Sequence, residues 1–210
     1  LSLDAPIVTL VWQWWFATNF NIHITSHEYI ILFATVWLLY ALDRWLDAWK
    51  PDLTKPHSSR HAFYVYYRWP VAIIWLIILI TTAILSLTSL NQKTLVAGFT
   101  LLALCAIYFI LVHVQRRWRV IPKEARVGAA VSLGVTLCLW TQITSLDLML
   151  ATFSFALLVT LNCILIAIWE EPLDKAQRFS SVAFTLSRGW LEPSMIIFLG
   201  TMIAFGFYQH

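Results

Sequence analysis

PVAIIWLIILITTAILSLTSL, residues 70–90, is the stretch of sequence that decides the fold. It holds no charged side chain, and at about 1.5 Å per residue a helix of this length spans the roughly 30 Å hydrocarbon core of a bilayer. The stretch is continuously apolar rather than alternating, which favours a helix over a strand of a membrane barrel. We therefore expect a membrane-spanning helix here.

Apolar segments of similar character recur on both sides of this stretch. The chain of 210 residues is 60% hydrophobic and 12% charged, and its mean hydropathy of +0.74 is high for a soluble domain of this size. The sequence predicts an all-α, polytopic transmembrane helical bundle that forms a single domain over residues 1–210. About seven spans are expected, at 6–22, 28–43, 70–90, 94–114, 127–143, 147–169 and 192–208.

Several residue types inside these segments are interpreted as packing or interface residues. Many of the 12 Trp residues lie at predicted span ends, where an indole ring suits the headgroup level. The three cysteines, Cys105, Cys138 and Cys163, show no metal-ligand spacing and are interpreted as small apolar side chains. Gly128 and Gly134 are predicted to let helices pack closely.

The charged side chains gather on one predicted face. Of the 14 basic residues, 13 fall in the segments 44–69, 115–126 and 170–191, and only Lys93 falls on the other side. Basic loops favour the cytoplasmic face. We therefore expect an integral protein of a bacterial inner membrane, with the amino terminus and the loops 44–69 and 170–191 cytoplasmic. The net charge of +3 gives no reason to expect a nucleic acid partner.

Two pairs of carboxylates share this face. The second span ends in YALDRWLD, with Asp43 and Asp47, and the sixth ends in AIWEEPLD, with Glu170 and Asp174. Like charges four residues apart on a helix repel by about 0.2–0.5 kcal/mol, and carboxylate oxygens suit Mg²⁺, which would relieve that repulsion. Solvated helix ends without a metal are the alternative. The repeated spacing, four helices apart, favours two related halves with a site between them.

These residues resemble the UbiA superfamily of intramembrane prenyltransferases. That family has Asn-Asp-x-x-Asp-x-x-x-Asp after its second helix and Asp-x-x-x-Asp after its sixth, and the two acidic pairs above match the ends of these motifs. Residues 55–59, KPHSS, resemble the Arg-Pro segment that follows the first motif. The stretch from Arg178 to Gly189 resembles the lead into the seventh helix.

The resemblance implies an enzyme that transfers a prenyl group from a polyprenyl diphosphate to a lipophilic or aromatic acceptor inside the membrane. It implies Mg²⁺ held by catalytic carboxylates of Asp43, Asp47, Glu170 and Asp174. Apolar helices would shield an allylic carbocation from water. We expect substrate contacts from polar side chains near the acids, namely Lys50, Lys55, Arg60, Lys123, Arg126 and Asn162.

The sequence also departs from the family pattern. Leu39 and Tyr40 stand where the family has Asn-Asp, Pro172 lies inside the second motif, and seven spans are expected where the family usually has nine. These departures favour a second hypothesis, a non-catalytic UbiA-like subunit or scaffold that associates with other membrane subunits. Both hypotheses keep the same fold.

Overall fold

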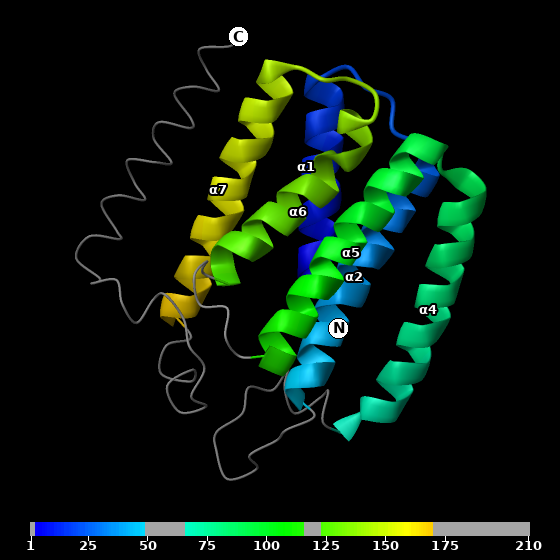
Figure 1. Ribbon diagram of the computed structural model, residues 1–210, viewed down its shortest axis with the longest axis vertical. Helices are drawn as coiled ribbons and strands as arrows, with labels where there is room; N and C mark the ends of the chain where they lie inside the picture. Colours follow the sequence, from blue (N-terminus) through cyan, green and yellow to red (C-terminus); the bar gives the residue numbers. More distant parts are fainter. Residues whose placement is uncertain (1–2, 49–65, 116–122, 170–210) are drawn as a thin grey trace.

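The computed structural model describes residues 3–48, 66–115 and 123–169, which form α-helices and no strands (Figure 1). Two of the described helices, α4 and residues 146–166 of α7, are long and apolar enough to cross a membrane. In chain order the helices are α1 (Asp4–Asn19), α2 (Ser26–Ala48), α4 (Arg68–Ser89), α5 (Gln92–Gln115), α6 (Lys123–Trp140) and α7 (Leu146–Trp169).

The all-α prediction is confirmed over this part of the chain. Each of the first six predicted spans coincides with one of the helices, and the predicted span 192–208 lies outside the described residues. Several helix ends differ from the prediction by a few residues, and two of these differences involve charged residues. The helix α2 continues through Ala48 and α6 begins at Lys123, so charged residues that were assigned to loops belong to helices.

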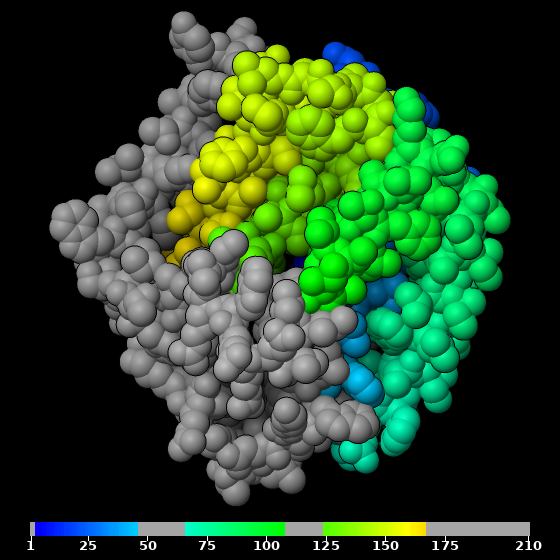
Figure 2. Space-filling view, in the orientation of Figure 1, coloured from blue at the N-terminus to red at the C-terminus, as the bar shows by residue number. Residues whose placement is uncertain are grey.

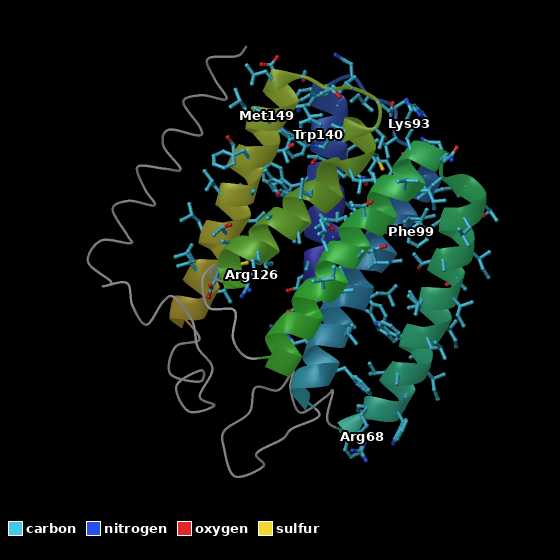
Figure 3. The ribbon with its side chains drawn as sticks, in the orientation of Figure 1. Arg68, Lys93, Phe99, Arg126, Trp140 and Met149 are labelled. Atoms are coloured by element: carbon cyan, nitrogen blue, oxygen red, sulfur yellow. The ribbon has the colours of Figure 1, made fainter. Side chains whose placement is uncertain are left out.

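Successive helices run in opposite directions, so their ends gather at two ends of the bundle (Figure 1). One end holds the last residues of α2, α5 and α7 and the first residues of α4 and α6. We call it the acidic-motif end. The other, the connection end, holds the short segments 20–25, 90–91 and 141–145. Figure 3 labels Arg68 at the acidic-motif end and Lys93 at the connection end.

Side-chain caps start the three helices that leave the connection end. Thr25 and Glu28 form a capping box before α2, in which the Thr25 backbone N–H donates to the Glu28 carboxylate at 2.7 Å. Asn91 and Ser145 each accept a hydrogen bond from the backbone N–H three residues later, at 2.9 and 3.1 Å. These caps satisfy backbone donors that a helix leaves unpaired in its first turn.

The end of α1 is fixed by a backbone motif of the Schellman type. Asn21 takes a φ of 52°, a left-handed conformation that asparagine accepts more readily than most residues. The Ile22 N–H donates to the Ala17 carbonyl at 2.9 Å, and the Asn21 N–H donates to the Thr18 carbonyl at 3.3 Å. The chain therefore turns sharply from α1 toward α2.

The main core lies where α1, α2, α6 and α7 meet. Its aromatic part joins α1 to α7, with the ring centroids of Trp12 and Phe155 4.6 Å apart and those of Phe16 and Phe155 5.5 Å apart. Buried hydroxyls join α6 to α7 as well, with Thr136 and Thr152 at 3.4 Å. These hydroxyls also donate hydrogen bonds to carbonyls of their own helix, so burying them away from water costs little free energy.

Gly128 lets α6 and α7 come into close contact. A Cβ added at Gly128 would meet the Thr160 hydroxyl and would lie 2.6 Å from the Ala156 carbonyl oxygen. The predicted packing role is thus confirmed for Gly128. At Gly134 an added Cβ would make only ordinary contacts, at 3.9 Å or more, so a glycine is not required there.

In contrast to the core helices, α4 has no buried residue, and Figure 2 shows it at the edge of the molecule. Eight of its Ile and Leu side chains are at least one third exposed: Ile73, Ile74, Leu76, Ile77, Leu79, Ile80, Ile84 and Leu87. Full burial of one such side chain stabilises a protein in water by about 1.5–3 kcal/mol. Because the eight side chains are on average about half exposed, the burial free energy that they do not gain is roughly 6–12 kcal/mol in total. That is comparable to the whole stability of a typical domain, about 5–15 kcal/mol.

We predict that Gly128→Ala lowers the free energy of unfolding by about 1–3 kcal/mol, because the new methyl group overpacks the α6–α7 contact. The matched control is Gly98→Ala, where an added Cβ meets nothing within 4 Å. That control should leave stability unchanged or raise it by up to about 1 kcal/mol through helix propensity. Unfolding in detergent followed by circular dichroism measures both. Equal stability of the two variants would contradict the close contact.

Candidate functional site

The carboxyl-terminal half of α2 is held against α4 by tryptophans. The Trp75 indole N–H donates to the Leu38 carbonyl at 2.8 Å, and the Trp45 indole N–H donates to the Arg68 carbonyl at 3.2 Å. Ala41 is fully buried among these indoles. An indole N–H in an apolar setting needs an acceptor, and each of these bonds supplies one from the neighbouring helix.

Asp43 lies on a different side of α2 from this α4 contact. Asp43 and Trp45 are about 200° apart around the helix, at roughly 100° per residue. Leu32 contacts α6 beside Gly134, and Asp43, eleven residues later, returns to nearly the same face. The half-buried Asp43 therefore lies on the α6-facing side of α2, near its acidic-motif end.

The other three predicted metal ligands are placed less fully. Asp47 belongs to α2, one turn beyond Asp43 and on the same side, although the structure describes its backbone only. Glu170 and Asp174 lie outside the described residues, directly after the end of α7. The ends of α2 and α7, which lead to the two acidic pairs, lie at the same end of the bundle (Figure 1).

Among residues 3–48, 66–115 and 123–169, no three His, Cys, Asp or Glu side chains lie together as a metal-binding group. Asp43 is the one predicted ligand whose side chain is described, and its carboxylate is the kind of oxygen donor that Mg²⁺ takes. The donor chemistry therefore fits the ion. The metal site itself stays a prediction.

The predicted substrate-binding residues are only partly described. Arg126 is half-buried on α6 near the acidic-motif end, as Figure 3 shows. Asn162 is exposed on α7. Lys123 begins α6, and only its backbone is described, whereas Lys50, Lys55 and Arg60 lie outside the described residues.

Glu124 is a further acid that the sequence did not single out. It lies in the first turn of α6 at the acidic-motif end, and only 2% of its surface is exposed. A carboxylate is favoured at a helix amino terminus by the helix dipole. In the sequence, Glu124 lies at the boundary between a charged segment and an apolar one. Acidic residues at such boundaries are usually exposed to solvent at the start of a helix, so nothing in the sequence indicated that Glu124 is buried.

Arg44 has a defined position on the neighbouring side of α2. Its guanidinium lies 5.2 Å from the centroid of the Tyr40 ring, and it donates to the Tyr40 hydroxyl at 3.5 Å. This contact between a cation and an aromatic ring orients the charge. The acidic-motif end thus carries Asp43 on α2 and Glu124 and Arg126 on α6. Carboxylates are the residue type that binds a metal ion, and a guanidinium is the type that binds phosphate.

Comparisons with known protein families, with curated proteins and with solved structures found no match to this chain.

We predict that Trp45→Phe lowers the free energy of unfolding by about 1 kcal/mol, because it removes the hydrogen bond to the Arg68 carbonyl but keeps an aromatic ring. Trp69→Phe is the matched control, since Trp69 is 62% exposed, and it should change stability by less than about 0.5 kcal/mol. Thermal unfolding of the purified protein measures both. A loss at Trp69 equal to that at Trp45 would show that the bond does not hold α2 to α4.

Proposed function

We propose that this chain is an integral membrane protein of the UbiA-like type, with seven spans, which transfers a prenyl group from a polyprenyl diphosphate to a lipophilic acceptor. The observation that carries the proposal is the common location of the two helix ends that lead to the acidic pairs. Asp43 and Asp47 lie in the last part of α2, and the last residues of α7, which precede Glu170 and Asp174 in the sequence, lie at the same end of the bundle.

The exposed apolar surface supports a membrane location. The helix α4 is mostly apolar, and none of its residues is fully buried in the bundle. A soluble monomer rarely exposes a continuous apolar patch larger than a few hundred Å². Lipid removes the cost of that exposure, and helices satisfy their own backbone hydrogen bonds in lipid.

The distribution of charge supports the orientation. Arg68 and Arg126 lie near the acidic-motif end and Lys93 lies at the connection end, and the three segments rich in basic residues all adjoin the acidic-motif end in sequence. The rule for basic loops then puts this end in the cytoplasm of a bacterial cell. The diphosphate group of a donor at the cytoplasmic membrane surface would reach the acids directly.

The chemistry follows from the residue types. Asp43, Asp47, Glu170 and Asp174 would hold Mg²⁺, which neutralises charge that develops on a leaving diphosphate. Arg126 and Lys123 on α6 would contact diphosphate oxygens, since guanidinium and ammonium groups donate several hydrogen bonds to phosphate. The apolar helices would keep water from the allylic cation, so the acceptor rather than water would capture it.

One observation favours the second hypothesis, a non-catalytic UbiA-like subunit of a larger membrane complex. Tyr40 stands where the family has a metal-binding acid, and its ring and hydroxyl contact the guanidinium of Arg44. A tyrosine engaged in this way supplies no carboxylate. A subunit without catalytic function would keep the fold and lose this ligand.

We predict Mg²⁺-dependent transfer from radiolabelled geranylgeranyl diphosphate to a lipophilic acceptor by the purified full chain. Asp43→Asn and Asp174→Asn should each lower turnover about 100-fold or more, because a metal ligand contributes several kcal/mol to the transition state. The matched control is Asp147→Asn, which changes an exposed acid in the first turn of α7 at the connection end. It should keep full activity.

Absence of turnover with every acceptor tried, together with stoichiometric partner proteins in the purified material, would contradict the enzyme and support the subunit. Equal loss of activity in Asp43→Asn and Asp147→Asn would instead show a general effect of charge removal.

The proposed orientation predicts opposite labelling of two single cysteines. In a background with Cys105, Cys138 and Cys163 replaced by alanine, Lys93→Cys should react with a membrane-impermeant maleimide added to intact cells. Arg68→Cys should react only after the cells are opened. Both native side chains are exposed, so burial does not explain a difference. Labelling of both positions in intact cells would contradict the topology.

A further inference from the structure

A hollow of about 320 Å³ lies between α2 and α4. We call it the α2–α4 groove, and Ile30, Phe33 and Trp37 of α2 face Ile78, Thr82 and Leu85 of α4 across it. The α2 residues are spaced three and four apart, so they form one stripe along the helix. The groove is therefore an elongated apolar surface that runs along both helices.

The α2–α4 groove is separate from the candidate site. Asp43 is six residues from Trp37, which puts it about 120° away around α2. The groove lies beside α4, whereas Asp43 lies on the α6-facing side. A molecule in the groove would therefore not contact the predicted metal ligands.

Two guanidinium groups lie beyond one end of the groove. Arg44 is seven residues from Trp37, two turns along the same face of α2 and about 10 Å nearer the acidic-motif end. Arg68 begins α4, and the bond from the Trp45 indole to its carbonyl, at 3.2 Å, keeps the two helices together at this level. Arg44 is half-buried and Arg68 exposed, so both sit at the border between apolar helix and solvent.

We propose that the α2–α4 groove binds an acyl chain of an anionic phospholipid whose phosphate lies between Arg44 and Arg68. The apolar stripe matches a hydrocarbon chain, and the two cations match an anionic headgroup at the depth where the chain ends. Basic residues between helices on the cytoplasmic side recognise such headgroups, and arginine forms paired hydrogen bonds with phosphate oxygens. The inference rests on the proposed membrane location and orientation but not on prenyl transfer.

Native mass spectrometry of the purified, delipidated full chain tests this, with phosphatidylglycerol and phosphatidylcholine of the same acyl chains as probes. We expect one phosphatidylglycerol to bind about tenfold more tightly than phosphatidylcholine. Thr82→Phe should abolish that site by filling the groove. Ile80→Phe, on the exposed side of α4, is the matched control and should bind as the unaltered protein does.

The double variant Arg44→Gln, Arg68→Gln should lose the preference for phosphatidylglycerol and still bind phosphatidylcholine, whereas Lys93→Gln at the connection end should keep the preference. Unchanged binding by Thr82→Phe, or a retained preference in the double variant, would overturn the proposal. So would groove-dependent binding of geranylgeranyl diphosphate or of a second copy of the chain in place of phosphatidylglycerol. The prenyl transfer assay measures turnover and not lipid binding. The proposed lipid site and the proposed prenyl transfer can therefore each fail without the other.

Discussion

The outward-facing apolar surface of α4 and α7 determines which environment the bundle needs and which contacts must hold its helices together. The two helices are long and apolar enough to cross a membrane, and no residue of α4 is fully buried by the rest of the bundle. In water this exposure would cost roughly as much free energy as a whole domain gains by folding. In lipid the cost disappears, and the bundle then needs only local contacts to hold its helices together. Those contacts are the close approach at Gly128, the aromatic rings between α1 and α7, and the indole bonds between α2 and α4.

The two ends of the bundle differ in their polar side chains. The connection end has tight turns and capped helices, with Thr25, Asn91 and Ser145 satisfying the first backbone donors. The acidic-motif end collects Asp43, Arg44, Glu124 and Arg126 on helices that are packed against one another. Polar side chains on rigid helices keep fixed positions, which a site for a metal ion and a diphosphate requires. The connection end therefore holds short structural turns, and the acidic-motif end holds the charged side chains to which the proposed site is assigned.

Much of the helical architecture could be predicted because it depends on properties of single segments. The uninterrupted apolar run at 70–90 predicts α4, and Gly128 was expected to allow close packing. The predicted span bounds placed residues 44–48 in a loop, although the spacing of Asp43 and Asp47 was already interpreted as helical. The contact of Trp45 with the Arg68 carbonyl could not be predicted, because the two residues are far apart in sequence. Burial of Glu124 was missed for a similar reason, since hydropathy treats an acid at a segment boundary as solvated. The acidic pairs were proposed from their spacing alone, and spacing does not say how far apart the ends of α2 and α7 lie.

The most direct test of the central claim is the distance from bound Mn²⁺, in place of Mg²⁺, to nitroxide labels at positions 68 and 93, measured by electron paramagnetic resonance on the full chain. The two positions lie near opposite ends of the bundle, separated by the length of α4, about 33 Å at 1.5 Å per residue. If Asp43 and Asp47 of α2 and the two acids that follow α7 in the sequence hold the ion, Mn²⁺ should be much closer to the label at position 68 than to the label at position 93. Binding nearer to position 93, or no saturable binding, would contradict a metal site at the acidic-motif end.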